Sequence, residues 1–178
     1  MSIEMIREQL PEYARDLKLN LSSVLAPSGA PSLSQQQIAA VALATAIAAR
    51  NRPLAQALEA WAESQLDQAQ MTAARAAAAI MSMNNIYYRF LHLVEDGEYQ
   101  NLPARLRMNV IGNPGIDRLD FELLSLAVSA LNGCGLCITS HERKLRAGGV
   151  GREAIQSAVR IAAVVHAVAV VLDHQTPP

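Results

Sequence analysis

Both cysteines of the chain lie in the segment LNGCGLCITSHERKL, residues 131–145. Cys134 and Cys137 are three residues apart, and His141 follows the second cysteine by four residues. If the segment is helical, residues at these spacings share one face, and the two cysteines lie about 5–6 Å apart, within the range of a disulfide. The spacing therefore predicts a sulfur pair that opens and closes reversibly, with an imidazole one helical turn further along.

The residues around the pair favour a reactive sulfur. Asn132 and Gly133 fit a helix start just before Cys134. In a first helical turn, unpaired N–H groups and the positive end of the helix dipole stabilise a thiolate. On this basis Cys134, on the more open turn, is the expected nucleophile toward a disulfide partner. A histidine exchanges protons near neutral pH, so His141 can act as acid or base at Cys137.

Glu122 is a carboxylate within the apolar stretch FELLSLAV, residues 121–128, which leads into the cysteines. If it faces the interior, desolvation raises its pKa toward the range of a general base. If it faces solvent, it is an ordinary glutamate near a helix N-terminus, where a negative charge is favourable. The spacing leaves both interpretations open.

Two other uses of the cysteines compete with redox chemistry. Structural zinc takes four ligands, and this segment supplies three, so the fourth would come from His92, His166, His174 or a carboxylate. Free cysteines are also often small buried hydrophobes. Because Gly133 and Gly135 leave room for a substrate beside Cys134, we favour redox chemistry, with no metal and no bound cofactor.

The composition predicts an all-α fold in one domain over residues 1–178, with the cysteine unit at about 119–172. Of the 178 residues 51% are hydrophobic and only 4% aromatic. Alanine and other good helix formers dominate, and no alternating strand pattern is present. VALATAIAARN (41–51) resembles LSLAVSALNGC (124–134), which suggests two related helical units or a chance likeness of alanine-rich helices. Helices are expected over residues 13–24, 34–50, 53–66, 71–94, 119–131, 134–148 and 151–172, with loops at 26–32, 95–103 and 111–117 and a short segment at 104–110.

Charge and hydropathy narrow the class of protein. The net charge of −1 leaves no basic footprint for nucleic acid, and the 17% of charged residues suggests that another copy covers part of the surface. The first residues lack a signal peptide's pattern. The apolar run 158–172 is shorter than the roughly 20 residues of a membrane span, so it predicts a buried C-terminal helix. We expect a cytoplasmic protein that binds neither membrane nor nucleic acid.

The spacing of Glu122, Cys134, Cys137 and His141 resembles the E-x11-C-x-x-C-x-x-x-H signature of the alkyl hydroperoxidase D (AhpD) family, within the carboxymuconolactone decarboxylase-like group. The likeness extends to LPEYARDLKLNLSSV, AAAIMSMNNIYYRF and LRMNVIGNPGIDRLDFEL, and so to nearly the full length. It implies a helical homotrimer whose CxxC pair reduces hydroperoxides and relays electrons. The implied donor is a lipoyl dithiol on a dihydrolipoamide acyltransferase component, recharged by lipoamide dehydrogenase, and the implied acceptor is an AhpC-type peroxiredoxin.

The resemblance also implies roles for single residues. Cys137 corresponds to the cysteine that meets peroxide and Cys134 to its partner, while Glu122 and His141 correspond to a proton relay. Leu136 departs from relatives that carry a histidine there, which puts the strength of the peroxidase activity in doubt. Two rival functions remain: a decarboxylase or isomerase on the same scaffold, which needs no CxxC, and a metal-binding or thiol-sensing module.

Two asparagines interrupt the apolar stretch of residues 77–90. Asn84 and Asn85 are adjacent polar residues in a segment that otherwise reads as a buried helix. Buried polar groups normally have hydrogen-bond partners, so we expect both to satisfy neighbouring groups. Contact with a substrate is the alternative.

Overall fold

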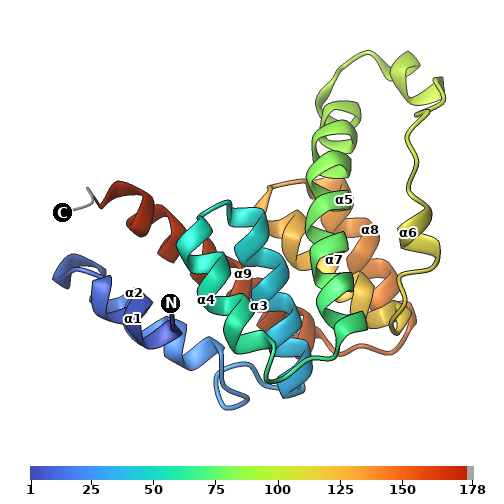
Figure 1. The fold of residues 1–178 in the computed structure, drawn as a ribbon. Coiled ribbons are helices and arrows are strands. Elements are labelled where there is room, and N and C mark those ends of the chain that lie inside the picture. Colours follow the sequence, from blue (N-terminus) through green and yellow to red (C-terminus); the bar gives the residue numbers. More distant parts are fainter. Residues whose placement is uncertain (176–178) are drawn as a thin grey trace.

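The computed structural model describes residues 1–175, which form α-helices and two short 3-10 helices and contain no strand (Figure 1). The predicted all-α class is therefore confirmed. The elements are α1 (Ile3–Gln9), η1 (Glu12–Ala14), α2 (Arg15–Val24), α3 (Gln35–Ala49), α4 (Arg52–Ala62), α5 (Gln68–Leu93), η2 (Gly97–Asn101), α6 (Asn109–Gly112), α7 (Arg118–Leu131), α8 (Gly135–Ala147) and α9 (Arg152–His174).

Side-chain caps explain why the long helices begin where they do. Ser34 and Gln37 form a reciprocal capping box at the start of α3, and Asp67 and Gln70 form another at the start of α5. Such boxes satisfy N–H groups that the first helical turn leaves unpaired. The helices expected over 34–50 and 71–94 are confirmed, with α5 beginning three residues earlier than expected because Asp67 caps it.

Three local features differ from the expectations. The helix α1 was missed, although Ser2 caps it by accepting a hydrogen bond from the Met5 N–H. The stretch after Pro11 begins as the 3-10 helix η1 before α2 follows. The short segment expected at 104–110 is not helical before Asn109, and α6 extends into the loop expected at 111–117.

The centre of the molecule is α3, which packs against α4, α5, α7 and α9. Its buried residues are mostly alanines, whose small side chains let neighbouring helices approach closely. Figure 1 shows α5, α7 and α8 side by side, and the contacts between them agree. These three helices carry the cysteines and the residues predicted to assist them.

The C-terminal helix α9 packs along α2, α3 and α7, which confirms the buried C-terminal helix expected from the apolar run. Within residues 1–175, α9 is the one helix long and apolar enough to cross a membrane by length and composition. It covers 23 residues, close to the helix expected over 151–172. Ile161, Val165 and Val168 are fully buried in the bundle, so α9 has the packing of a core helix.

The C-terminal part of α5 stands away from the bundle, and the chain returns to α6 through η2 (Figure 1). Ile86, Phe90 and Leu93 recur at helical spacing on this part of α5 and are 66%, 46% and 69% exposed. Tyr99 of η2 packs edge-on against Phe90, with ring centroids 5.3 Å apart. This part of α5 therefore presents an apolar stripe that is largely open to solvent.

Candidate active site

The two cysteines lie at the N-terminus of α8. Cys134 is the N-cap, and its Sγ accepts a hydrogen bond from the Cys137 N–H at 3.3 Å. Gly133 just before it has a φ of +69°, a left-handed conformation that glycine adopts without strain. Cys134 and Cys137 are joined by a disulfide, with Cα atoms 5.3 Å apart. The predicted helix start and sulfur pair are therefore confirmed.

The two sulfurs differ in access. Cys134 is fully buried, whereas Cys137 is 6% exposed and lines a cleft of about 380 Å³. The expectation that Cys134 occupies the open side is therefore wrong. As the N-cap, Cys134 folds its side chain back over the first turn of α8, while Cys137, one turn later, faces the cleft.

The cleft combines an apolar wall with a few polar groups. Residues from α5, α6, α8 and the segment before α6 surround the Cys137 sulfur. The apolar lining is Met81, Tyr88, Met108, Ile111 and Leu136. The polar lining is Asn84, Ser140, His141 and Lys144. Leu136, the residue that departs from the family signature, thus lies in the cleft itself and adds apolar surface there.

Behind the cleft, Glu122 of α7 connects two side chains of α8. Its Oε2 lies 2.5 Å from His141 Nδ1, and its Oε1 accepts a hydrogen bond from Lys144 Nζ at 2.8 Å. The Glu122 side chain is only 13% exposed. The structure thus brings Glu122 and His141 together, and the interpretation of Glu122 as a solvated first-turn residue is wrong.

The expectation of a raised Glu122 pKa is also wrong. Burial raises the pKa of Glu122, but hydrogen bonds from His141 and Lys144 and the charges of these partners outweigh burial. The net pKa lies below the ordinary value of 4.5. Glu122 is therefore a carboxylate at neutral pH and can only accept hydrogen bonds. The hydrogen between the pair then sits on His141 Nδ1, and Nε2 is the ring nitrogen outside this contact.

The consecutive asparagines of α5 differ in their hydrogen-bond partners. Asn85 has a partner at each end of its amide: its Nδ2 donates to Ser129 Oγ and its Oδ1 accepts from Asn132 Nδ2, each at 2.9 Å. Asn84 lines the cysteine cleft, and its buried Oδ1 has no hydrogen-bond partner among the described residues. The expectation that both satisfy neighbouring groups therefore holds for Asn85 only.

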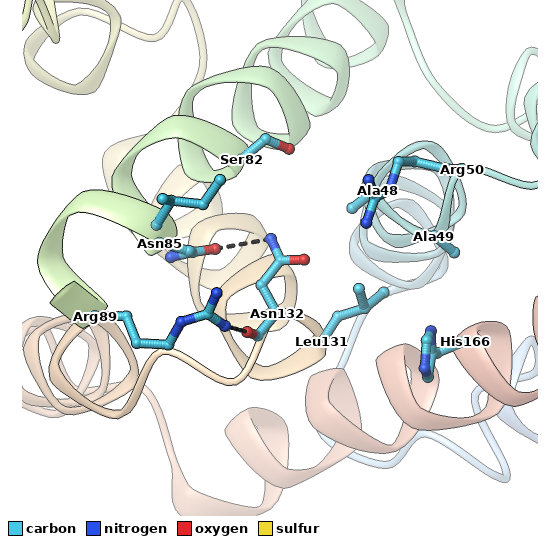
Figure 2. A pocket seen from close by; sticks show the side chains of 10 residues that line it. Ala48, Ala49, Arg50, Ser82, Asn85, Arg89, Leu131, Asn132 and His166 are labelled. Carbon is cyan, nitrogen blue, oxygen red and sulfur yellow. Dashed lines mark hydrogen bonds between the residues drawn. The ribbon is translucent and has the colours of Figure 1, made fainter. Parts of the chain in front are cut away.

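Arg89 completes the polar network on the Asn85 side. Its Nη1 donates to the Asn132 carbonyl oxygen at 2.7 Å, and Figure 2 shows both interactions of Asn132. The network borders a second cavity of about 390 Å³, which Arg50 and His166 also line. This cavity has no cysteine in its lining. Its polar groups hold the turn that leads into Cys134.

No cluster of potential metal ligands is present in the described part of the chain. Across residues 1–175, no three His, Cys, Asp or Glu side chains gather where they could hold a metal ion. His166, one candidate fourth ligand, is exposed on α9 and lines the second cavity. Cys137 shares its cleft with His141, which Glu122 contacts from α7.

The amino-acid sequence of the chain is similar to those of known proteins. Residues 97–174 match the model of the Carboxymuconolactone decarboxylase family. The chain is 59% identical to the alkyl hydroperoxide reductase AhpD of Gluconacetobacter diazotrophicus, across 97% of this chain and 93% of that protein. It is 57% identical to the AhpD of Coxiella burnetii, strain Dugway 5J108-111, across 94% of each. The chain therefore belongs to the AhpD family, as its signature predicted.

Proposed function

We propose that this chain is a thiol-dependent alkyl hydroperoxide reductase and disulfide relay, in which Cys134 and Cys137 alternate between dithiol and disulfide. The observation that carries the proposal is the disulfide itself, with one sulfur in a cleft beside His141. The relatives called alkyl hydroperoxide reductase AhpD support it at 54–59% identity. The apolar wall of the cleft suits an organic hydroperoxide.

In the oxidative half-reaction, His141 Nε2 takes the proton of the Cys137 thiol, with Glu122 fixing the imidazole through Nδ1. The Cys137 thiolate attacks the terminal oxygen of ROOH, and the O–O bond breaks. The departing alkoxide takes the proton from the imidazolium and leaves as ROH. Cys137 is now a sulfenic acid. The Cys134 thiol attacks its sulfur, water leaves, and the disulfide closes.

In the reductive half-reaction, a dithiol opens the disulfide by exchange. Because only Cys137 reaches the cleft, the incoming thiolate attacks the Cys137 sulfur. Cys134 leaves as a thiolate, which the Cys137 N–H at the start of α8 stabilises. The second thiol of the donor then attacks the mixed disulfide and releases Cys137, so two electrons enter as the donor becomes a disulfide.

The partners follow from this chemistry together with the family. A lipoyl group is a dithiol on a long flexible arm, which suits a sulfur that lies at the bottom of a cleft. The donor is therefore a lipoylated dihydrolipoamide acyltransferase component, kept reduced by lipoamide dehydrogenase with NADH. An AhpC-type peroxiredoxin accepts the electrons when peroxide does not. The cycle needs a compartment that maintains dithiols, which favours the cytoplasm.

A homotrimer is part of the same proposal. The exposed apolar stripe of Ile86, Phe90 and Leu93 on α5 is a surface that another copy of the chain would cover. Such a stripe is costly to leave in water, and α5 continues past the bundle at its C-terminal end (Figure 1).

A coupled assay tests the function directly. NADH oxidation is followed with lipoamide dehydrogenase, dihydrolipoamide and cumene hydroperoxide, and free thiols are counted before and after reduction. Cys134→Ser and Cys137→Ser should each abolish turnover, and the wild-type protein should gain two thiols on reduction. Full turnover by either cysteine variant would reject the mechanism. Bound zinc with no thiols gained would favour the sensor instead.

A further inference from the structure

We propose that the side-chain amide of Asn84 binds the hydroperoxide group of the substrate and positions it at Cys137. This inference rests on the proposed peroxidase function and adds a residue outside the Glu–Cys–Cys–His signature. Asn84 comes from α5, whereas the signature residues come from α7, α8 and the turn between them.

The position of Asn84 is the first support. Its backbone carbonyl oxygen lies 4.0 Å from the Cys137 sulfur, so the residue borders the reacting atom directly. Asn84 is also one of the residues that line the cleft of Cys137 and His141. A group that reaches the Cys137 sulfur through this cleft therefore comes close to Asn84.

The unmet hydrogen-bonding capacity of Asn84 is the second support. The residue is 4% exposed, and its Oδ1 is buried with no hydrogen-bond partner within residues 1–175. An unpartnered buried polar group costs free energy, so a core position would favour an apolar residue. Asn85, its neighbour, has partners on both ends of its amide. The contrast indicates that Asn84 awaits a partner from outside the chain.

The hydrogen-bond donor and acceptors of a hydroperoxide are complementary to those of a carboxamide. The terminal O–H of ROOH is a donor for the amide oxygen, and both peroxide oxygens accept hydrogen bonds from an amide N–H. As the Cys137 thiolate bonds to the terminal oxygen, negative charge moves to the oxygen that carries R, until His141 returns the proton. An N–H already placed there stabilises that charge without adding charge of its own. The apolar wall, including Met81 and Tyr88, holds the R group.

The test measures the two half-reactions separately in the Asn84→Leu variant. Leucine is close to asparagine in size but lacks both hydrogen-bonding groups of the amide. The rate constant for the reaction of the reduced protein with cumene hydroperoxide should fall on the order of 100-fold. The rate at which dithiothreitol opens the Cys134–Cys137 disulfide should stay near the wild-type rate. The melting temperature should not fall, because Leu fills a place where Oδ1 had no partner.

Asn84→Ser is a second variant in case Asn84→Leu does not fold. It should show the same selective loss of reactivity with hydroperoxide, because the serine hydroxyl is too short to replace the amide. Asn85→Leu is the matched control, and it should lower the melting temperature because it leaves Ser129 and Asn132 without their partner.

Two outcomes would overturn the proposal: Asn84 variants that react with hydroperoxide at the wild-type rate, or variants that lose both half-reactions together with stability. Wild-type protein that does not react with hydroperoxide would instead reject the proposed function.

Discussion

At the scale of single residues, Glu122 is set up to orient an imidazole rather than to take a proton. It lies outside the lining of the cysteine cleft, and both of its oxygens are engaged by α8. A carboxylate with a lowered pKa is a poor base at neutral pH. In the proposed mechanism, its effect on Cys137 therefore passes through His141, whose tautomer it selects.

The lowered pKa of Glu122 predicts a pH-dependent contribution to stability. A carboxylate whose pKa is lower in the folded than in the unfolded protein stabilises the fold above its unfolded value near 4.5. This contribution is lost as the pH falls through the folded value. Glu122→Gln should cost about 1–3 kcal/mol of unfolding free energy at pH 7, and the cost should shrink in acid. Urea denaturation at several pH values measures it.

The same variant should slow the reaction with hydroperoxide on the order of 100-fold, because the imidazole loses its orienting charge. Glu142→Gln is the control, since it removes an equal charge from α8 at a residue that makes no hydrogen bond to His141. A Glu122 variant whose stability differs from wild type by the same amount at every pH would contradict the assignment.

At the scale of elements, α5 serves two sites with adjacent residues. Asn84 faces the cleft with α8, whereas Asn85 and Arg89 reach the turn between α7 and α8 (Figure 2). Consecutive residues of a helix point about 100° apart, so one helix can line a reaction cleft and also support the turn before it. The Cys134 turn is thus held from α5 as well as from α7.

Arg89 should matter for stability more than its exposed neighbours do. Arg89→Leu removes a charged hydrogen bond to the buried side of the Asn132 turn, which is worth about 1.5–3 kcal/mol. Arg75→Leu on the same helix removes the exposed ion pair with Glu59 and should cost less than about 1 kcal/mol. Urea denaturation measures the unfolding free energy of the two variants. Faster amide hydrogen exchange at Gly133 should accompany the Arg89 change only, and equal effects of the two variants would contradict this role.

At the scale of the whole molecule, the projecting part of α5 predicts where copies meet. Ile86→Glu combined with Leu93→Glu places charges in the exposed apolar stripe and should convert the proposed trimer to monomers. Leu19→Glu is the matched control, because Leu19 is 59% exposed on α2, away from that stripe. Light scattering after size exclusion gives the mass. A double variant with the wild-type mass would place the interface elsewhere.

The sequence alone determined much of the local structure. Helix starts at Ser34 and Asp117 follow from caps that act within four residues. The Cys134–Cys137 pair follows from the three-residue spacing within one turn. These features depend on neighbours along the chain, so a single sequence contains all the groups involved.

Only the tertiary structure decided how these elements face one another. Spacing could not show that Lys144 reaches Glu122 from another helix and lowers its pKa. Nor could it show that Asn84 rather than Asn85 lines the cleft, or that Cys137 is the accessible sulfur. Helical periodicity fixes which residues share a face, but the rotation and docking of each helix decide what that face meets.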